Sequence, residues 1–532
     1  MKSRVLKLLS LALALMMVVC VFSACGKDSG ESSDVVDVQY VDQYGNPIDP
    51  DSLGGDGNND TASEDGTASD KDTSSTKGTS SKKGTSSKKG TSSKGTNSKK
   101  TNSTVNKGNS STKVVTGKTK FEANPYSDIP AELKGTTVKV LLWRTPEATD
   151  TALAAAFEKK TGIKVQYISV PNDNSSYATK LATLVSSKES PDVVCMGATV
   201  FPSFAISYLE PLDKEVFRLE DPFWNKAYMN AYSINGRYYA LSSYGTWYCD
   251  DTAYVTYYNP AALKKNGIET TPYQIWKANK SAWTVDKMVE LARKFKAKND
   301  TYHGISYQSN TIANPYLLAA GGEFVKYNGK KFSSNLSNST VLNMSMKLAD
   351  WYTEGLIEGW DSEGVGKGTV AFFDAIAYGM YKDANWFTIP TSQVECVPVA
   401  GTHTPANPKV WGVPKNATNA QGGAYFLRFF LDPNSFKETS FGSFENTFAS
   451  KQMHEVFAYI NASSTPKAVN YTRGLLDFYD TGAYGTFTNA LSSTTSANIK
   501  TSLDSFGRTM DAACNRANKK LGTASTKSSY LK

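Results

Sequence analysis

The stretch from residue 138 to 196 constrains the fold of this 532-residue chain more than any other part. Val138–Trp143 is an apolar run with β character, and Lys164–Val170 alternates as a strand does. A helical pattern between them stops near Gly162, a second helical pattern follows, and a third strand-like run is Pro191–Met196. The order strand, helix, strand, helix, strand predicts a parallel sheet of the α/β class.

The ends of these strands predict where a ligand binds. In open α/β sheets, ligands lie beyond the carboxyl ends of the strands. Trp143 and Arg144 follow the first strand, and Gly197 and Thr199 follow the third. We therefore expect these positions to lie beside a binding site.

Later segments continue the α/β pattern over a length that suits two lobes. Thr284 is placed to cap a helix, a second helix over about 340–354 ends at Gly355, and Val394–Val399 reads as a strand. A further helix is expected over about 420–431, and the last hundred residues look mainly helical. The folded part runs from about 130 to 532, which is too long for one small core.

The start of the chain predicts export and a lipid anchor. Lys2, Arg4 and Lys7 precede an apolar run, and small residues lead to Cys25, so residues 1–24 read as a lipoprotein signal peptide. We expect Cys25 to be lipidated and the protein to lie at the extracytoplasmic face of the cell membrane. An ordinary signal peptide or an uncleaved anchor is the alternative, although the apolar run is shorter than the roughly twenty residues that span a membrane.

Residues 25–129 read as a disordered tether. They are rich in Ser, Thr, Gly and Lys, and a unit such as Gly78–Lys83 recurs without apolar side chains to bury. The tether is acidic before residue 71 and Lys-rich after it, and the chain has a formal net charge of +8. Because the basic half lacks Arg and interleaved aromatic residues, we expect no nucleic-acid partner. Solvation, or contact with the cell wall or a lipid surface, remains open for it.

Cysteine and histidine spacing predicts no metal site and no cofactor. Cys195, Cys249, Cys396 and Cys514 are scattered, and no pair has metal-ligand spacing. Cys195 and Cys396 lie in strand-like runs, where buried free thiols are expected and a disulfide between them is the alternative.

A series of short phrases, in order, resembles family 1 of the extracellular solute-binding proteins of ABC importers. Together the phrases cover about 135–435, whereas the last hundred residues match less well. The phrases are Val138–Val165, Pro191–Val194 with Leu209–Asp213, Asn235–Leu241, Tyr257–Pro260 with Gly267-Ile268, Trp283-Thr284, Gly321–Phe324, Trp351-Tyr352 with Gly355-Leu356, Gly379-Met380 with Asn385-Trp386, and Val397–Val399.

The resemblance implies a type II clamshell of two lobes that exchange strands. One lobe would hold about 130–247 and 397–455, and the other about 248–396 and 456–520. A carbohydrate, in particular an oligosaccharide, would bind between the lobes of a monomer, and the closed form would dock on the permease subunits of an ABC importer. The resemblance implies no catalysis.

Aromatic faces bind the apolar faces of sugar rings, so Trp and Tyr residues are the first candidates for the ligand site. Trp143 follows the first strand, Tyr244 and Trp247 precede the expected crossover, and Trp411 falls in a predicted loop. Trp386 matches a family position that stacks on ligand. We assign Trp224, Trp276, Trp351 and Trp360 to packing or to the surface.

Polar candidates lie beside these aromatic residues. They are Arg144, Glu147, Asp250 with its neighbour Asp251, Glu323, Asp383 and Asn385. Asp192 is expected to hold its own loop by hydrogen bonds rather than to contact a ligand.

Other functions remain open at this stage. A glycosidase would need two carboxylates across the scissile bond, and no motif proposes such a pair. The adjacent Tyr257 and Tyr258 could ligate ferric iron, although they precede a strand-and-turn phrase that sugar-binding relatives also carry. A clamshell used for surface adhesion or sensing, or a receptor for a solute that is not a sugar, completes the alternatives.

Overall fold

The fold is taken from a computed structural model. It describes residues 126, 129–142, 144–170, 174–197, 203–243, 253–308, 315–406, 409–462, 464–469, 471, 475 and 491–528, together with strands β1 (Tyr40–Val41) and β2 (Pro47–Ile48). The chain divides into two units, residues 1–105 and 106–532. In the first unit, β1 pairs with β2 in antiparallel orientation, a feature that the predicted tether did not include.

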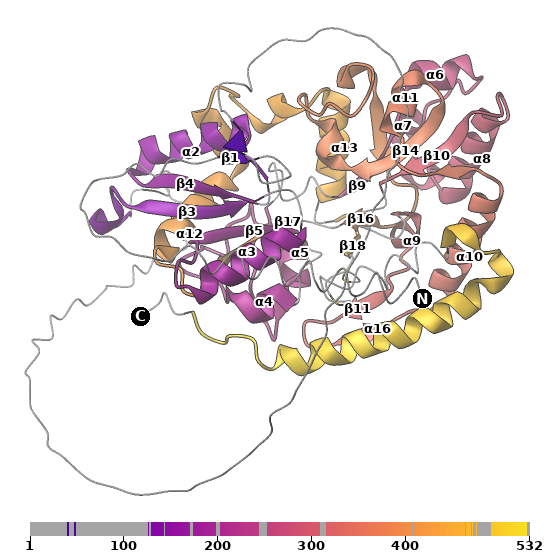
Figure 1. Cartoon of the computed structure of the whole chain (residues 1–532). Helices are drawn as coiled ribbons and strands as arrows, with labels where there is room; N and C mark the ends of the chain where they lie inside the picture. Colours follow the sequence, from indigo (N-terminus) through magenta and orange to yellow (C-terminus); the bar gives the residue numbers. More distant parts are fainter. Residues whose placement is uncertain are drawn as a thin grey trace, which may run out of the picture. The chain divides into compact units, whose positions relative to one another are not determined.

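The first five-stranded sheet has the order β4-β3-β5-β17-β6. Its strands are β3 (Thr137–Leu142), β4 (Lys164–Ser169), β5 (Val193–Gly197), β6 (Leu209–Glu210) and β17 (Lys409–Pro414). β3 pairs in parallel with both β4 and β5, which confirms the predicted parallel α/β arrangement (Figure 1). β17 pairs antiparallel with β5 and β6, so the chain leaves this sheet after Glu210 and returns to it at Lys409.

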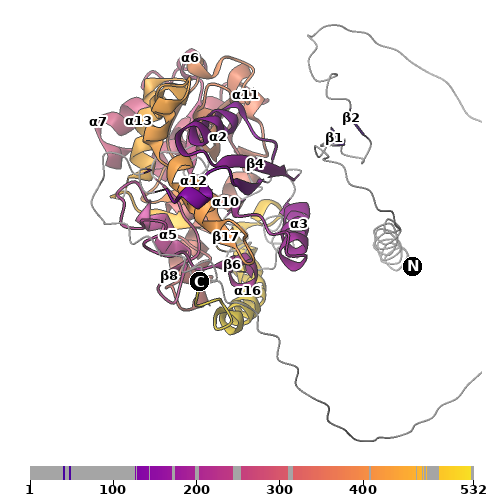
Figure 2. The ribbon, with the colours of Figure 1, turned by 90° about the vertical axis from the view of Figure 1, so that its left-hand side faces the viewer.

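Helices on this sheet follow the predicted pattern. α2 (Ala148–Thr161) ends where Gly162 adopts a left-handed φ of 74°, and α3 (Asn174–Ser186) is the second predicted helix. α12 (Ala420–Phe430) packs against α2, where Phe157 meets Phe426 with ring centroids 5.6 Å apart, and Figure 2 shows the two helices as neighbours. This aromatic contact forms part of the apolar core of the lobe.

The second five-stranded sheet has the order β13-β10-β14-β9-β15. Its strands are β9 (Tyr254–Tyr258), β10 (His303–Tyr307), β13 (Ile357–Glu358), β14 (Val370–Ile376) and β15 (Glu395–Pro398). β10 is parallel to β13 and β14, whereas β9 is antiparallel to β14 and β15. The carboxyl ends of β10, β13 and β14 therefore meet at one edge of this sheet.

The helices of the second lobe include both predicted ones. α8 (Val285–Lys296) begins after Thr284, whose side chain accepts a hydrogen bond from the Lys287 amide, and α10 (Ser339–Thr353) ends just before Gly355. The other helices of this lobe are α6 (Pro260–Lys265), α7 (Pro272–Ala278), α9 (Pro315–Ala319) and α11 (Ser362–Lys367). α13 (Lys451–Asn461) packs on β15, so these residues also lie against the second sheet.

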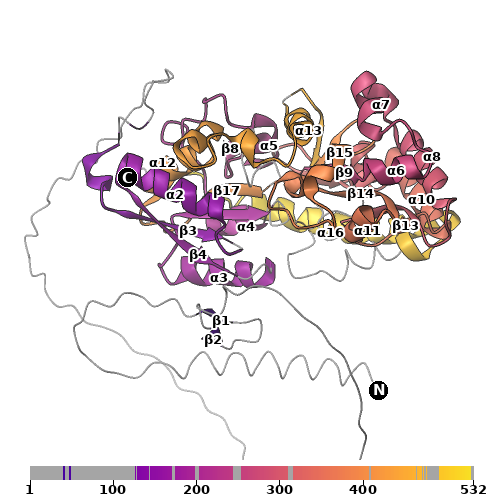
Figure 3. The same cartoon turned by 90° about the horizontal axis from the view of Figure 1, so that it is seen from above.

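Three segments run together between the two sheets, where Figure 1 labels β16 and β18, and Figure 3 shows the two sheets from above. β16 (Thr404–Ala406) pairs in parallel with β18 (Lys467–Val469), and Ala406 bridges to Ala253, just before β9. The placement of β17 in the first sheet and of β9 and β15 in the second confirms the two-lobed fold with exchanged strands. The predicted lobe limits themselves stay a prediction.

Shorter elements complete the described part of the chain. They are α4 (Ser203–Tyr208), α5 (Lys226–Ala231), β7 (Ser233–Ile234), β8 (Arg237–Tyr238), β11 (Val325–Tyr327), β12 (Phe332–Ser334), α16 (Ile499–Leu521) and the 3-10 helices η2 (Ala131–Leu133), η4 (Lys280–Ala282), η5 (Ala377–Met380), η6 (Thr391–Gln393), η7 (Pro433–Glu438), η8 (Phe444–Thr447) and η9 (Ser496–Asn498). α16 contacts α10 and β12 of the second lobe and α4 of the first. Within the described ranges, no helix combines the length and apolar character needed to cross a membrane.

The structure shows whether three of the cysteines are thiols or form disulfides. Cys195, Cys396 and Cys514 are buried and are not in disulfides, so the possible disulfide between Cys195 and Cys396 is not formed. Cys195 belongs to β5 in the first sheet and Cys396 to β15 in the second, which separates them. Cys25 and Cys249 lie outside the described residues.

Candidate ligand-binding site

Some of the predicted ligand residues fall on segments that the structure does not describe. Trp143, Tyr244, Trp247 and Asp250, with its neighbour Asp251, lie outside the described residues. Their roles stay predictions. Apart from Trp411, the remaining candidates are distributed over three separate places in the fold.

The first place is an aromatic cluster at the carboxyl edge of the second sheet, made of Trp360, Phe373, Tyr378 and Trp386. We call it the aromatic edge. The Trp386 ring centroid lies 5.5 Å from that of Trp360, 5.6 Å from that of Tyr378 and 6.3 Å from that of Phe373. Trp360 is 50% exposed, and Trp386 is half-buried. The cluster therefore has a packed base and an open indole surface.

The strands of the second sheet position this cluster. Trp360 comes two residues after the end of β13, and Tyr378 belongs to η5, which directly follows β14. Gly379 makes room for the Trp386 indole, because a Cβ atom at this glycine would lie 2.7 Å from Cε3 of Trp386 and 2.9 Å from the Tyr257 hydroxyl. The hydroxyl of Tyr257 donates to the Ile376 carbonyl over 2.9 Å and thereby ties β9 to the end of β14.

Polar residues flank Trp386 on an exposed loop. Asp383 and Asn385 are both exposed. Asn385 lines a cavity of about 380 Å³ together with Lys382, Phe387 and Ser392. Both residues lie within three positions of Trp386 in the sequence, and their role beside it stays a prediction.

The second place is the start of α2, where Arg144 and Glu147 surround a buried carboxylate. Both terminal nitrogens of the Arg144 guanidinium donate to Asp150, and the Nη2–Oδ1 distance is 3.0 Å. The Glu147 amide donates to the same carboxylate over 2.6 Å, and Asp150 has no exposed surface. Through these hydrogen bonds to Asp150, Arg144 and Glu147 stabilise the start of α2.

The role predicted for Asp192 is confirmed. Its carboxylate accepts from the Lys139 amide over 2.9 Å and from the Asn419 amide over 2.6 Å. These bonds connect β3 to the start of α12. Burial raises the pKa of Asp192, and the two amides oppose that shift.

The prediction that Trp411 lies in a loop is wrong. This residue belongs to β17, where it pairs with Cys195 of β5, and its ring centroid lies 5.0 Å from that of Phe430. The side chain is fully buried. Gly412, which follows Trp411 in the strand, allows close approach of the Tyr239 carbonyl, whose oxygen would lie 2.9 Å from a Cβ atom at this position.

Glu323 lies in the third place, a cavity of about 870 Å³ that shares no lining residue with the aromatic edge. It comes from the segment just before β11 and is half-buried. Burial raises the pKa of its carboxyl group, and the nearby Lys326 and the Val469 amide oppose this. The structure therefore separates Glu323 from Trp386.

The two adjacent tyrosines have structural partners. Tyr257 donates to the Ile376 carbonyl and Tyr258 to Glu395 Oε2 over 2.6 Å, and both rings are buried in β9. Successive strand residues point to opposite faces of a sheet, which does not suit two ligands of one iron ion. Among the described residues, no group of three or more His, Cys, Asp or Glu side chains could hold a metal ion.

Sequence reasoning missed Trp360 and Tyr378 at the aromatic edge. Trp360 was assigned to packing or the surface, and exposure confirms the surface assignment, yet its neighbours make it part of the cluster. The usable signal was position, because Trp360 closely follows a strand whose carboxyl end lies at the ligand side of a parallel sheet. That strand, β13, has two residues, too few to show a periodic pattern.

Comparison with known proteins identifies the family. The profile of the bacterial extracellular solute-binding proteins matches residues 143–435, more than half of the chain. The chain belongs to this family, as the resemblance in its sequence predicted. No curated protein sequence matches it.

Solved structures share the fold at low sequence identity. The galacto-N-biose/lacto-N-biose I-binding protein of an ABC transporter from Bifidobacterium longum, in complex with lacto-N-biose, is 16% identical and has a TM-score of 0.53, over 74% of this chain and 98% of its own. The sugar-binding protein MalE from Xanthomonas citri is 15% identical with a TM-score of 0.56, over 72% and 98%. UgpB from Mycobacterium tuberculosis, in complex with glycerophosphocholine, is 15% identical with a TM-score of 0.54, over 72% and 99%.

Proposed function

We propose that this protein is the lipid-anchored receptor of an ABC importer, that it binds a carbohydrate between its lobes, and that it delivers the sugar to the permease without catalysis. Membership of the solute-binding family and the type II fold support the receptor role. The aromatic edge is the observation that favours a carbohydrate. Lacto-N-biose in one structural relative agrees with this ligand class.

The chemistry of the aromatic edge suits a pyranose ring. The C–H faces of a sugar pack on an indole face, and amide or carboxylate side chains bind the hydroxyl groups. Trp360 is half exposed, and its ring packs against that of Trp386. Asn385 and Asp383 are exposed and directly precede Trp386 in the chain. A ligand held here that also contacted the other lobe would favour the closed form by its additional contacts.

A thermal-shift panel of mono- and oligosaccharides tests the ligand class, because a ligand that binds the folded state raises its stability. We expect a concentration-dependent rise in melting temperature with at least one sugar. Trp360→Ala should remove most of that rise while shifting the melting temperature of the ligand-free protein by only a few degrees, since half of the indole is already exposed.

Tyr302→Ala is the matched control. Tyr302 is half-buried, packs on Phe295 with ring centroids 5.2 Å apart, and directly precedes β10 at the opposite edge of the same sheet. The sugar-induced shift should survive this change. A panel without any shift, or equal losses in Trp360→Ala and Tyr302→Ala, would overturn the assignment of the aromatic edge.

A choline-bearing solute is the second candidate. Aromatic clusters also bind quaternary ammonium groups through cation–π attraction, and glycerophosphocholine is the ligand of one structural relative. Adding glycerophosphocholine to the panel separates the two classes. A shift with this compound and none with sugars would replace the carbohydrate assignment.

A further inference from the structure

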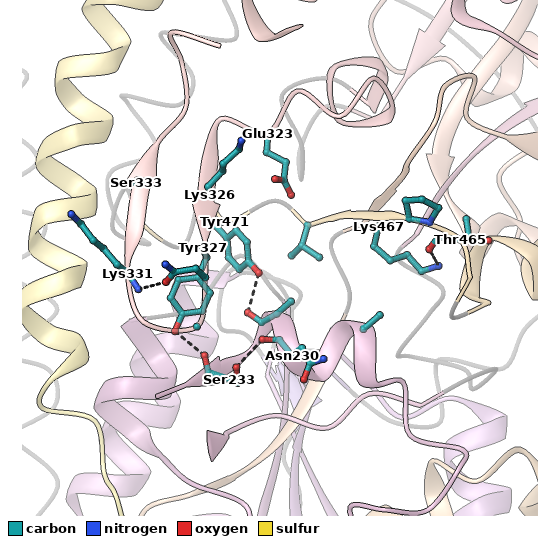
Figure 4. A pocket seen from close by; sticks show the side chains of 16 residues that line it. Asn230, Ser233, Glu323, Lys326, Tyr327, Lys331, Ser333, Thr465, Lys467 and Tyr471 are labelled. Atoms are coloured by element: carbon teal, nitrogen blue, oxygen red, sulfur yellow. Dashed lines mark hydrogen bonds between the residues drawn. The ribbon is translucent and has the colours of Figure 1, made fainter. Parts of the chain in front are cut away.

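The cavity of about 870 Å³ that contains Glu323 is formed by segments of both lobes (Figure 4). Asn230 and Ser233 come from α5 and β7 of the first lobe, and Lys326 and Tyr327 come from β11 of the second. The chain around β18 forms the remaining wall. Its volume falls within the roughly 300–1,000 Å³ that is usual for small-molecule sites.

Hydrogen bonds between the lobes hold the walls of this cavity in place. The Tyr327 hydroxyl donates to the Ser233 carbonyl over 2.7 Å, and the Tyr471 hydroxyl donates to the Ala231 carbonyl over 3.0 Å (Figure 4). The Tyr327 ring stacks on Phe332 with centroids 4.0 Å apart. The cavity is therefore bounded by two fixed aromatic rings rather than by exposed side chains alone.

The charged groups of the lining have mixed signs. Glu323 is half-buried, and its carboxylate points toward the open space in Figure 4. Lys326 and Lys331 are exposed. Lys467 is held by two backbone carbonyls, those of Ala462 and Thr465, each 2.9 Å from its Nζ. A ligand thus meets one carboxylate, exposed amines, and the amide of Asn230.

We propose that this cavity is a second binding site, separate from the aromatic edge, for a neutral polyhydroxylated molecule such as a short saccharide. A hydroxyl group can donate a hydrogen bond to the carboxylate and accept one from an ammonium or amide group. A polyol can therefore bind both the negatively and the positively charged groups of the lining. A charged ligand is disfavoured, because an anion would be repelled by Glu323 and a cation would be repelled by the lysines. The half-buried Tyr327 supplies apolar surface for a sugar ring, and the buried Tyr471 packs behind it.

Lysine labelling of the full-length protein tests the site directly. Acetylation of Lys326 and Lys331 is followed by peptide mass spectrometry in the presence of maltose, glucuronate or choline. We expect maltose to slow the labelling of both lysines several-fold, with little effect from the two charged probes. Lys519, exposed on α16 and outside the cavity lining, should label at an unchanged rate.

Two variants show whether the protection belongs to this cavity. Glu323→Gln keeps the side-chain shape but removes the charged acceptor, so most of the protection should be lost. Glu132→Gln, an exposed residue of η2, should keep it. Absence of protection by maltose, stronger protection by a charged probe, or full protection in Glu323→Gln would each overturn the proposal. Because Trp360→Ala leaves this cavity intact, failure at one site is distinguishable from failure at the other.

Discussion

At the scale of single residues, burial and partners decide what a charged side chain does. Arg144, predicted as a ligand group beside a strand end, has its guanidinium bound to the buried Asp150, and its ligand role stays a prediction. Asp374 was not a candidate, yet it is fully buried in β14 and accepts hydrogen bonds from Thr256 and Tyr316. Residue type alone does not distinguish these situations.

Asp374 predicts a pH dependence of stability. Burial raises the pKa of its carboxyl group to about 7, whereas an unfolded aspartate has a pKa of about 3.9. Between these values only the folded state keeps the proton, so the free energy of unfolding should fall as pH rises from about 4 to about 7, on the order of 1 kcal/mol per pH unit.

Asp374→Asn tests this, because the amide is neutral throughout. The free energy of unfolding is measured with denaturant at pH 5 and at pH 8. Relative to the natural protein, the variant should be more stable at pH 8 than at pH 5. A difference that is the same at both pH values would show that Asp374 is ionised in the folded state across this range.

At the scale of elements, a few side chains join segments that are far apart in sequence. Asp192 joins β3 to α12, and Gly379 lets η5 approach Trp386. These contacts determine how the strand ends are placed. Loss of the Asp192 contacts should therefore lower stability, and a side chain at Gly379 should disturb the ligand site.

Asp192→Ala leaves two partly buried backbone N–H groups, those of Lys139 and Asn419, without their acceptor. We expect a loss on the order of 3 kcal/mol in the free energy of unfolding, since each unsatisfied group costs about 1–3 kcal/mol. Asp511→Ala, on the exposed face of α16, is the control and should unfold like the natural protein. Equal unfolding curves for Asp192→Ala and the natural protein would contradict the proposed connection.

Gly379→Ala should displace the Trp386 indole. The added Cβ atom would lie under 3 Å from two ring carbons and from the Tyr257 hydroxyl, all within a packed cluster. We expect altered tryptophan fluorescence and weaker sugar binding in the thermal-shift assay. Gly359→Ala, where nothing lies within 4 Å of the new atom, should preserve both signals, and the same loss in the two variants would argue against the packing explanation.

At the scale of the whole molecule, two lobes share three neighbouring connections and are also linked by α16. α16 spans 23 residues, about 35 Å at 1.5 Å per residue, and reaches elements of both lobes. Beyond it, Ser528 Oγ donates to the Pro211 carbonyl of the first lobe. The C-terminal segment, which the family resemblance covered least, therefore belongs to the connection between the lobes.

The anchor and the binding domain should be separable. Stable membrane attachment requires more than one lipid chain, and a lipidated Cys25 would supply it far from the ligand site in sequence. Cys25→Ser should therefore move the protein from the membrane fraction to the medium with unchanged sugar affinity. Retention in the membrane fraction would disprove anchoring through Cys25, and a change in affinity would show that attachment and binding are coupled.

The elements of the first lobe, and the start of α8 in the second, were readable in the sequence because their signals are local and periodic. Strand and helix patterns, Gly162 at the end of α2 and Thr284 at the start of α8 all act within a few residues. Asp192 was also assigned correctly, since a polar residue directly before a buried strand needs nearby donors.

The candidate site depended on contacts that no local pattern records. Trp360, Tyr378 and Trp386 come together only because β13, β10 and β14 pair in parallel and end at one edge. In the first sheet, the pairing of β17 with β5 buries Trp411, and Glu323 lines another cavity. The sequence by itself determined the elements and the family, whereas the tertiary structure decided which side chains are neighbours, because burial and proximity are properties of packed segments.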